Sequence, residues 1–262
     1  MSAHEKWIEF FSAKEANAIE LAPERSVLLI IDMQRYFVEL GNSFTDVLEK
    51  LVPTVYAGYL DRVHNHVIPK IQQLLAAFRK TGAPVMYITV GTESGDGQDL
   101  PCWLSALDTL GMETIGKPVC SPVNAPHWNI TDAIVSQKDE IISNKRSAGT
   151  FVTTNLQQEL QCQNIGHVVL CGVTTDICLS TTTREAADRG YKTVVVSDAC
   201  TTLSEELHAV HLETLKVYGE VRTTEVVTGH AADETGCVEI LPFLGRGGAL
   251  VVPSSFYSNT SF

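Results

Sequence analysis

The chain has 262 residues, 44% hydrophobic and 19% charged, which is the composition of an ordinary globular protein with one large domain. No apolar run reaches the roughly 20 residues that a membrane span needs, and charged residues occupy the N-terminus where a secretion signal has its apolar region. We therefore expect a cytoplasmic protein. The net charge of −12 argues against nucleic acid and anionic membranes as partners, because such binding depends on clustered Lys and Arg.

Neither the cysteines nor the histidines form a pattern typical of a metal site. Seven cysteines are scattered without a CxxC pair, which favours reduced thiols over a disulfide framework. The close pair His64 and His66 is two residues apart, so on a helix the two side chains point in different directions. The first predicted strand is followed by DMQRYF rather than a glycine-rich turn, which excludes a dinucleotide fingerprint at its usual place. We expect no metal and no cofactor.

Strand and helix patterns alternate along the chain. Continuous apolar runs predict six strands, at 26–32, 83–90, 139–143, 167–173, 192–199 and about 221–227. Helical spacing predicts helices at 69–82, from Thr154 (a capping box with Gln157), at 174–190 and at 204–219. Residues 91–132 form a long excursion with at most one short helix. The alternation predicts an α/β fold with a doubly wound, mostly parallel six-stranded sheet and helices on both faces.

Three residues whose side chains could take part in catalysis follow predicted strands, at the sheet edge where such folds bind ligands. Asp32 ends the first strand, Lys145 follows the 139–143 strand, and Cys178 begins the helix after the 167–173 strand. A helix start is expected to lower the pKa of a thiol, a carboxylate can accept its proton, and an ammonium favours both anions. Taken singly, Asp32 is better explained as a helix or loop cap and Lys145 as a solvated surface charge, and Cys178 is equally well explained as an ordinary residue at a helix start.

The two cysteines of the segment CGVTTDIC are expected to differ. Cys171 lies inside the apolar run HVVLCGV, where a thiol acts as a small hydrophobic group. Cys178 lies seven residues further on, past the end of that strand. We therefore interpret Cys171 as structural and Cys178 as the candidate nucleophile.

Three segments together resemble the isochorismatase-like cysteine hydrolases, over about residues 24–230. They are LLIIDMQRYF at 28–37, NKRSAGTFVTTNL at 144–156 and LCGVTTDICLSTTTREAADRGY at 170–191. The resemblance implies a three-layer fold of Rossmann type and a catalytic triad of Asp32, Lys145 and Cys178. It also implies a cis peptide bond between Val173 and Thr174, and an oxyanion hole formed by the backbone N–H groups of Thr174 and Cys178.

The resemblance further implies hydrolysis of an amide-type carbonyl through a thioester on Cys178. The third segment is most similar to enzymes that act on small ureides, such as biuret hydrolase or ureidoacrylate amidohydrolase. Isochorismate-cleaving members lack the cysteine, and the Asp-x-His metal pattern of nicotinamidases is replaced here by VGTESGDGQDL. Members commonly form dimers or tetramers, and the segments at the two ends of the chain are candidate oligomer arms.

The substrate contacts are predicted less directly than the triad. Candidate aromatic contacts are Phe37, Trp103 and Trp128, each of which is also explained by core packing. Arg35, Asn144 and Arg146 either meet a polar or anionic substrate or are solvated surface groups. Two alternatives stay open beside the amidohydrolase: a vinyl ether hydrolase of the isochorismatase type, and a binding or redox protein that keeps the fold without the chemistry.

Overall fold

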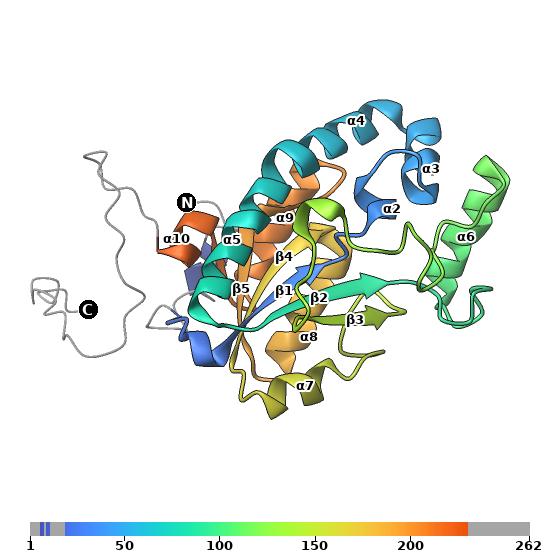
Figure 1. Cartoon of the computed structure of the whole chain (residues 1–262). Helices are drawn as coiled ribbons and strands as arrows, with labels where there is room; N and C mark the ends of the chain where they lie inside the picture. The colour runs from blue at the N-terminus through green and yellow to red at the C-terminus, as the bar shows by residue number, and fades with distance from the viewer. Residues whose placement is uncertain (1–5, 8, 11–18, 230–262) are drawn as a thin grey trace, which may run out of the picture. The chain divides into compact units, whose positions relative to one another are not determined.

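The computed structural model describes residues 6, 7, 9, 10 and 19–229, which contain a six-stranded sheet (Figure 1). The strands are β1 (Ser26–Ile31), β2 (Val85–Val90), β3 (Ile141–Lys145), β4 (His167–Val173), β5 (Lys192–Thr201) and β6 (Glu220–Arg222). Their order is β3-β2-β1-β4-β5-β6, and every neighbouring pair is parallel. The predicted fold class is confirmed. The predicted oligomer arms lie mostly outside the described residues.

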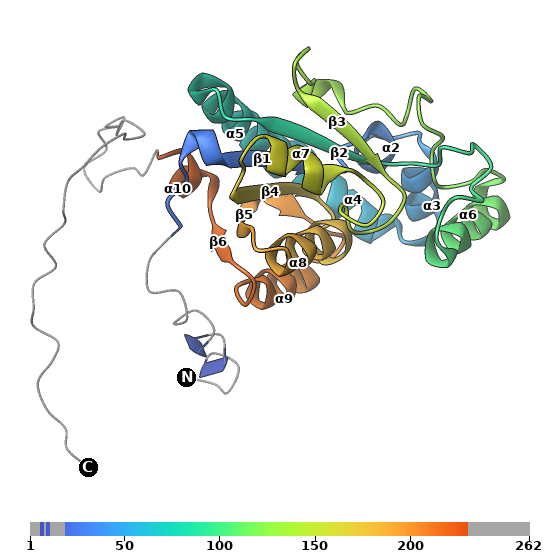
Figure 2. The ribbon, with the colours of Figure 1, turned by 90° about the horizontal axis from the view of Figure 1, so that it is seen from below.

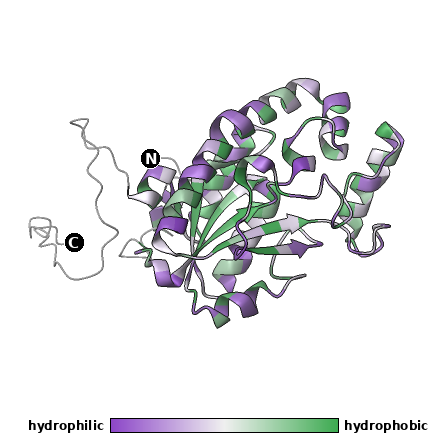
Figure 3. Ribbon diagram, in the orientation of Figure 1, coloured by the Kyte–Doolittle hydropathy of each residue, from purple (hydrophilic) through white to green (hydrophobic). Residues whose placement is uncertain are grey.

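The strands are apolar because both faces of the sheet are covered (Figure 3). Leu28 and Ile30 of β1 belong to one core, whereas Val27, Leu29 and Ile31 belong to the other, as the period of two in a strand requires. The first face is covered by α5 (Ile68–Thr81) and α10 (Thr224–Thr228). The second is covered by α7 (Leu156–Cys162), α8 (Ser180–Asp188) and α9 (Glu205–Leu215), as Figure 2 shows.

Two predicted helix boundaries agree with the structure. Helix α5 ends at Gly82, which adopts the left-handed conformation with φ of 74°. Helix α9 begins after Ser204, whose side chain accepts a hydrogen bond from the backbone N–H of Leu207. Glycine and serine thus mark helix ends here for the expected stereochemical reasons.

The predicted capping box and last strand are wrong in detail. Helix α7 begins at Leu156, and Thr154 accepts a hydrogen bond from the N–H of Leu156 at 3.1 Å instead of capping with Gln157. Strand β6 stops at Arg222, because the backbone and hydroxyl of Thr224 donate to Asp198 Oδ1 at 2.7 and 2.9 Å and begin helix α10. The third strand begins at Ile141 rather than 139, after a turn in which Glu140 N–H donates to Gln137 O.

Three helices lie between β1 and α5, and a fourth lies in the 91–132 excursion. They are α2 (Arg35–Val38), α3 (Ser43–Leu51), α4 (Pro53–Arg62) and α6 (Cys102–Ile115). The sequence did not predict the first three, and α6 is longer than the short helix expected. Figure 1 shows α2, α3 and α6 beyond the carboxyl ends of β1 and β2, so these helices cover the edge where chemistry is expected.

Short non-α turns complete the described chain. Two are 3₁₀ turns at Pro23–Arg25 and Asp132–Ile134, and two are π turns at Val63–Val67 and Thr175–Leu179. The first π turn joins α4 to α5, and the second joins β4 to α8. In the described part of the chain, no helix is long and apolar enough to cross a membrane.

Candidate active site

The strand order reverses between β1 and β4, and the site is built where these two strands end. Ile31 pairs with Gly172 in the register of the two strands. Gly172 has φ of 110°, and a Cβ atom there would lie 2.1 Å from Ile31 O. Only glycine therefore allows the two backbones to approach at this point. Asp32, directly after β1, also has a positive φ of 51°, an uncommon conformation for a residue other than glycine.

Asp32, Lys145 and Cys178 lie in direct contact at this edge. Lys145 is the last residue of β3 and is fully buried. Its Nζ donates to Asp32 Oδ2 at 2.9 Å, to Ser147 O at 3.0 Å and to Cys178 Sγ at 3.4 Å. These three partners use all three N–H groups of the ammonium. The Lys145 ammonium therefore has no N–H group left for a further partner beyond the Asp32 carboxylate, the Ser147 carbonyl and the Cys178 thiol.

Burial and pairing act in opposite directions on the ion pair. Burial raises the pKa of Asp32, although the neighbouring Lys145 lowers it in part. Burial tends to lower the pKa of Lys145, but Asp32 and Cys178 outweigh it, so its pKa is raised. Lys145 therefore stays charged, and Asp32 is a stronger base than an exposed carboxylate.

The predicted lowering of the Cys178 pKa is wrong for the resting site. Burial, followed by the charge of Asp32, raises the pKa of the thiol, and Lys145 offsets this only in part. A helix start favours a thiolate, but here the desolvated surroundings and a carboxylate outweigh that effect. At neutral pH Cys178 is therefore a thiol, and a thiolate would form there only with the help of a neighbouring base.

One oxygen of Asp32 is free to act as that base. Oδ2 accepts from Lys145, whereas Oδ1 is buried and has no hydrogen-bond partner in the described part of the chain. The Cys178 thiol lies close enough to Asp32 to lower the pKa of its carboxyl in part. A buried carboxylate oxygen without a partner is costly and uncommon outside functional sites. The arrangement can accept a proton at Oδ1 while Oδ2 keeps its ion pair.

The segment after β4 presents backbone at the same place. The Val173–Thr174 peptide bond is cis, and the π turn Thr175–Leu179 follows it. Thr174 O accepts from the N–H groups of Ile177 and Leu179 at 3.3 and 3.2 Å. Thr175 is buried, and its hydroxyl lies 2.9 Å from His208 Nδ1 on α9. These bonds fix the segment that carries Thr174 and Cys178, and their predicted oxyanion role stays a prediction.

Gln34, two residues after Asp32, ties the strand ends together. Its side-chain amide accepts from the N–H of Val90 at 2.8 Å and donates to Val90 O at 3.1 Å and Trp128 O at 2.7 Å. Gln34, in the segment DMQRYF, is fully buried, and its side chain is hydrogen-bonded to backbone. Its part in the site is to hold the end of β2 beside Asp32.

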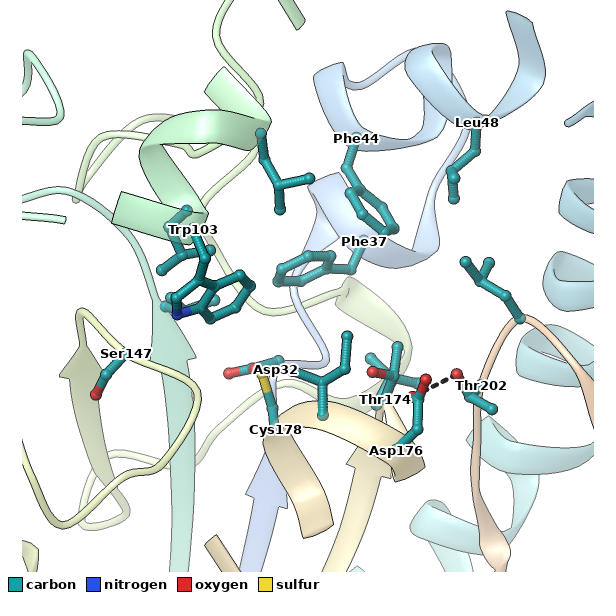
Figure 4. A pocket seen from close by; sticks show the side chains of 16 residues that line it. Asp32, Phe37, Phe44, Leu48, Trp103, Ser147, Thr174, Asp176, Cys178 and Thr202 are labelled. Atoms are coloured by element: carbon teal, nitrogen blue, oxygen red, sulfur yellow. Dashed lines mark hydrogen bonds between the residues drawn. The ribbon is translucent and has the colours of Figure 1, made fainter. Parts of the chain in front are cut away.

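A cavity of about 250 Å³ opens above Asp32 and Cys178 (Figure 4). One wall comes from α2 and α3 through Phe37, Phe44 and Leu48, and another from α6 through Trp103, Leu104 and Leu107. The rings of Phe37 and Phe44 pack edge to face, with centroids 4.9 Å apart. Val90, Val173, Ile177 and Leu203 add further apolar surface, and Ser147, Thr174, Asp176 and Thr202 are its other polar residues.

Two of the three predicted aromatic contacts lie at the cavity, and one does not. Phe37 and Trp103 line the cavity, but Trp128 does not. The indole N–H of Trp128 donates to Asn144 Oδ1 at 3.0 Å, so its role is to support the neighbouring loop. Sequence reasoning missed Phe44, Leu48 and Leu107; the four-residue spacings 44 to 48 and 103 to 107 were the available signal, once helices are placed there.

The predicted polar contacts are engaged elsewhere. Arg35 pairs with Asp132, and Arg146 pairs with Glu93 at 3.2 Å. Asn144 donates to Gly91 O at 3.0 Å in addition to accepting from Trp128. None of the three lines the cavity, so they form part of the scaffold around it.

Cys171 and His64, the other cysteine and histidine considered in the sequence, lie away from the cavity lining. Cys171 is fully buried in β4, and burial raises the pKa of its thiol, which agrees with a structural role. His64 lies in a π turn, with Nε2 2.8 Å from Val38 O. Among the described residues, no three His, Cys, Asp or Glu side chains are grouped as metal ligands.

Fold and site together define an α/β protein with a buried Asp, Lys and Cys cluster at the switch point of a doubly wound sheet. Residues 26–226 match the family model of the isochorismatase domain. The chain therefore belongs to the isochorismatase family of hydrolases, as its sequence motifs indicated.

Two curated relatives illustrate the similarity. The isochorismatase family protein YecD of Escherichia coli O157:H7 is 28% identical over 193 residues, which are 72% of this chain and 87% of the relative. The ureidoacrylate amidohydrolase RutB of Acinetobacter baylyi is 24% identical over 211 residues, covering 78% of this chain and 82% of RutB.

Solved structures share the fold. A cysteine hydrolase from Pseudomonas syringae pv. phaseolicola has a TM-score of 0.66 at 22% identity, over 80% of this chain and 94% of that one. N-carbamoylsarcosine amidase from Thermoplasma acidophilum has a TM-score of 0.54 at 19% identity, over 77% of this chain and 97% of the other. At these identities the likeness concerns architecture alone.

Proposed function

We propose that the chain is a cysteine-dependent amidohydrolase that cleaves the C–N bond of a small amide or ureide through a thioester. The observation that carries the proposal is the contact of Lys145 Nζ with both Asp32 and Cys178, beside an unpartnered Asp32 oxygen. This is the arrangement expected of a nucleophile, its base and an orienting cation. The cavity above them offers room for a small substrate.

The first half of the reaction forms the thioester. Asp32 accepts the proton of the Cys178 thiol as the sulfur attacks the carbonyl carbon and forms a C–S bond. Backbone N–H groups of Thr174 and Cys178 stabilise the tetrahedral oxyanion, an interaction whose loss typically costs about 100-fold or more in rate. The C–N bond then breaks as Asp32 returns the proton to the nitrogen, so ammonia or an amine leaves.

The second half regenerates the enzyme. Water adds to the thioester carbonyl while Asp32 accepts one of its protons. The C–S bond breaks, the acid product leaves, and the proton returns to the sulfur. Lys145 keeps its ion pair with Asp32 throughout and so limits the cost of ionising Cys178 in a buried site.

The relatives agree in the class of bond. RutB is named a ureidoacrylate amidohydrolase, and one of the structural neighbours is an N-carbamoylsarcosine amidase. Both names describe cleavage of a C–N bond next to a carbonyl. They support a class of reaction for this chain and not a particular compound.

The test is ammonia release from a panel of small primary amides and ureides. We expect the wild type to release ammonia from at least one compound, and Cys178→Ala to lose at least about 1,000-fold in kcat, because no other group supplies the covalent path. Cys162→Ala is the matched control, since Cys162 is an exposed cysteine at the end of α7, and it should keep full activity.

Two outcomes contradict the proposal. Ammonia release that survives Cys178→Ala excludes the thioester mechanism. If no compound of the panel releases ammonia, a binding or redox protein is favoured. If both the wild type and Cys178→Ala form pyruvate from isochorismate, a vinyl ether hydrolase is favoured. Trapping the acyl group on Cys178 by mass spectrometry after rapid acid quenching gives independent support.

A further inference from the structure

We infer that the substrate, on the proposed function, is an uncharged amide or ureide whose second substituent is apolar and carries no carboxylate. The cavity walls facing Asp32 and Cys178 are aromatic and aliphatic (Figure 4). Phe37, Phe44 and Leu48 on one side and Trp103, Leu104 and Leu107 on the other provide this surface. Such walls favour a hydrocarbon group. A charged group would lose its hydration there without gaining hydrogen bonds or an ion pair from these side chains.

The charges at the cavity are all negative. Among the described residues that line it there is no Lys, Arg or His, whereas Asp32 and Asp176 are both present. Asp176 accepts a hydrogen bond from the Thr202 hydroxyl at 2.6 Å and forms no ion pair in the described part of the chain. A substrate carboxylate would be desolvated and placed near like charges, and both effects oppose binding.

The cations around the site are already engaged. Lys145 is fully buried, and its three N–H groups point to Asp32, Ser147 and Cys178. Arg146 pairs with Glu93, and Arg62 donates to Thr202 O and Leu203 O. None of these three cations lines the cavity, so a substrate carboxylate there would meet none of them without a rearrangement of the walls. This places the expected substrate apart from the compounds named for the two amidohydrolase relatives, ureidoacrylate and N-carbamoylsarcosine, which both carry an acid.

The volume limits the size of the apolar group. A dry apolar cavity of about 150 Å³ holds one benzene molecule. The cavity here, about 250 Å³, therefore accommodates an amide or urea group with one ring or a branched chain of about four or five carbons. Among its polar lining residues, the Ser147 hydroxyl donates to Gly149 O and the Thr202 hydroxyl donates to Asp176. The Thr174 hydroxyl, which has no hydrogen-bond partner among the described residues, is left for the amide end.

Shape-matched substrates test the inference. Isobutylurea and N-carbamoylglycine differ only in an isopropyl group against a carboxylate, and 3-methylbutanamide and malonamate form the same pair among amides. We expect kcat/KM for the apolar member to exceed that for the acid by at least about 100-fold in both pairs. Cys178-dependent turnover that favours the acids overturns the inference and leaves the amidohydrolase proposal standing.

Binding separates this inference from the reaction. Cys178→Ala should bind isobutylurea at least about 100-fold more tightly than N-carbamoylglycine in calorimetry, whether or not the wild type releases ammonia. If that preference appears without any turnover, the apolar site is supported and the proposed reaction fails. If Cys178→Ala binds neither compound, or binds the acid better, the inference is wrong.

A charge placed in the wall provides a second test. Leu107→Arg adds a cation to the α6 side of the cavity, so the ratio of kcat/KM for N-carbamoylglycine to that for isobutylurea should rise at least about 10-fold. Leu110→Arg is the matched control, because Leu110 lies three residues further along α6, is exposed and does not line the cavity. An equal rise in both variants would mean that a general charge effect, and not the wall, sets the preference. Should Leu107→Arg not fold, the substrate pairs and the calorimetry still decide.

Discussion

Asp32 is the residue at which backbone conformation, burial and charge meet. It follows β1 directly, has a positive φ of 51°, and its side chain is only 1% exposed. Burial raises its pKa, and Lys145 keeps this rise from going further. A carboxylate whose pKa is raised by burial is a stronger base than an exposed one, which is the property that the proposed transfer of a proton from a thiol requires.

The pH dependence of kcat/KM should report this carboxylate. Asp32 has to be deprotonated to act as the base, so activity rises with pH through its pKa and is lost below it. Because burial raises that pKa above the ordinary 3.8, we expect the acid limb to have its midpoint above 3.8. Lys145→Met should move the midpoint further toward alkaline pH, since it removes the cation that lowers the pKa, and should lower kcat at least about 10-fold.

The measurement is a pH–rate profile on a Cys178-dependent substrate, with Arg146→Met as control. Arg146 pairs with Glu93 outside the cavity, so its loss removes a neighbouring cation without touching the triad. A midpoint at or below 3.8, or one that Lys145→Met leaves in place, would contradict the role given to the pair.

At the scale of elements, the contact between β1 and β4 sets the spacing of the site. Asp32 follows one strand and Thr174 follows the other, so any change in their separation moves the base relative to the segment that carries Cys178. Gly172 is the residue that allows the approach, because it meets Ile31 O with no side chain between them. The glycine of the segment CGVTTDIC therefore has a packing reason to be there.

We expect Gly172→Ala to lower the free energy of unfolding by about 3 kcal/mol or more, because its Cβ meets buried backbone and its φ disfavours alanine. Gly82→Ala is the matched control. Gly82 also has a positive φ, of 74°, but no atom of the described residues lies within 4 Å of its Cβ position, so only about 1 kcal/mol should be lost. Urea unfolding followed by circular dichroism measures both. Equal losses would show that the close approach does not matter.

At the scale of the molecule, one sheet serves two cores. Leu74 of α5 belongs to the core on one face, and Leu160 of α7 belongs to the core on the other. Adjacent residues of the same strands belong to the two different cores. Unfolding of one core therefore displaces strands that also form part of the other core. The site at the end of those strands depends on both.

Leu74→Ala and Leu160→Ala should therefore each lower the stability of the whole sheet by about 2–5 kcal/mol in a single shared transition. Thermal unfolding followed by circular dichroism, together with Cys178-dependent activity at rising temperature, checks this. Leu207→Ala, at an exposed position on α9, should change stability by less than about 0.5 kcal/mol. A transition that splits in only one of the two core variants would mean that the cores unfold independently.

The sequence by itself determined the fold class and the place of the triad. Strands buried on both faces read as continuous apolar runs, so β1, β2, β4 and β5 were predicted nearly to their ends. Residues directly after parallel strands must share one sheet edge, and the family motifs pointed to Asp32, Lys145 and Cys178 among them. These are local signals, and a single chain carries them.

Only the tertiary structure decided what surrounds the triad. Phe37, Phe44 and Leu107 pack against a third, smaller cluster of buried residues beside the cavity. The four-residue spacing of Trp103 and Leu107 could be interpreted only once α6 was placed there, and Trp128 proved to lie outside the cavity lining. The Cys178 pKa likewise depends on burial and on Asp32, which comes from a distant part of the chain. Burial and charge at a site are sums over neighbours brought together by folding. That is why the sequence predicted that Asp32, Lys145 and Cys178 share one sheet edge, but predicted neither the direction of the Cys178 pKa shift nor the apolar character of the cavity above them.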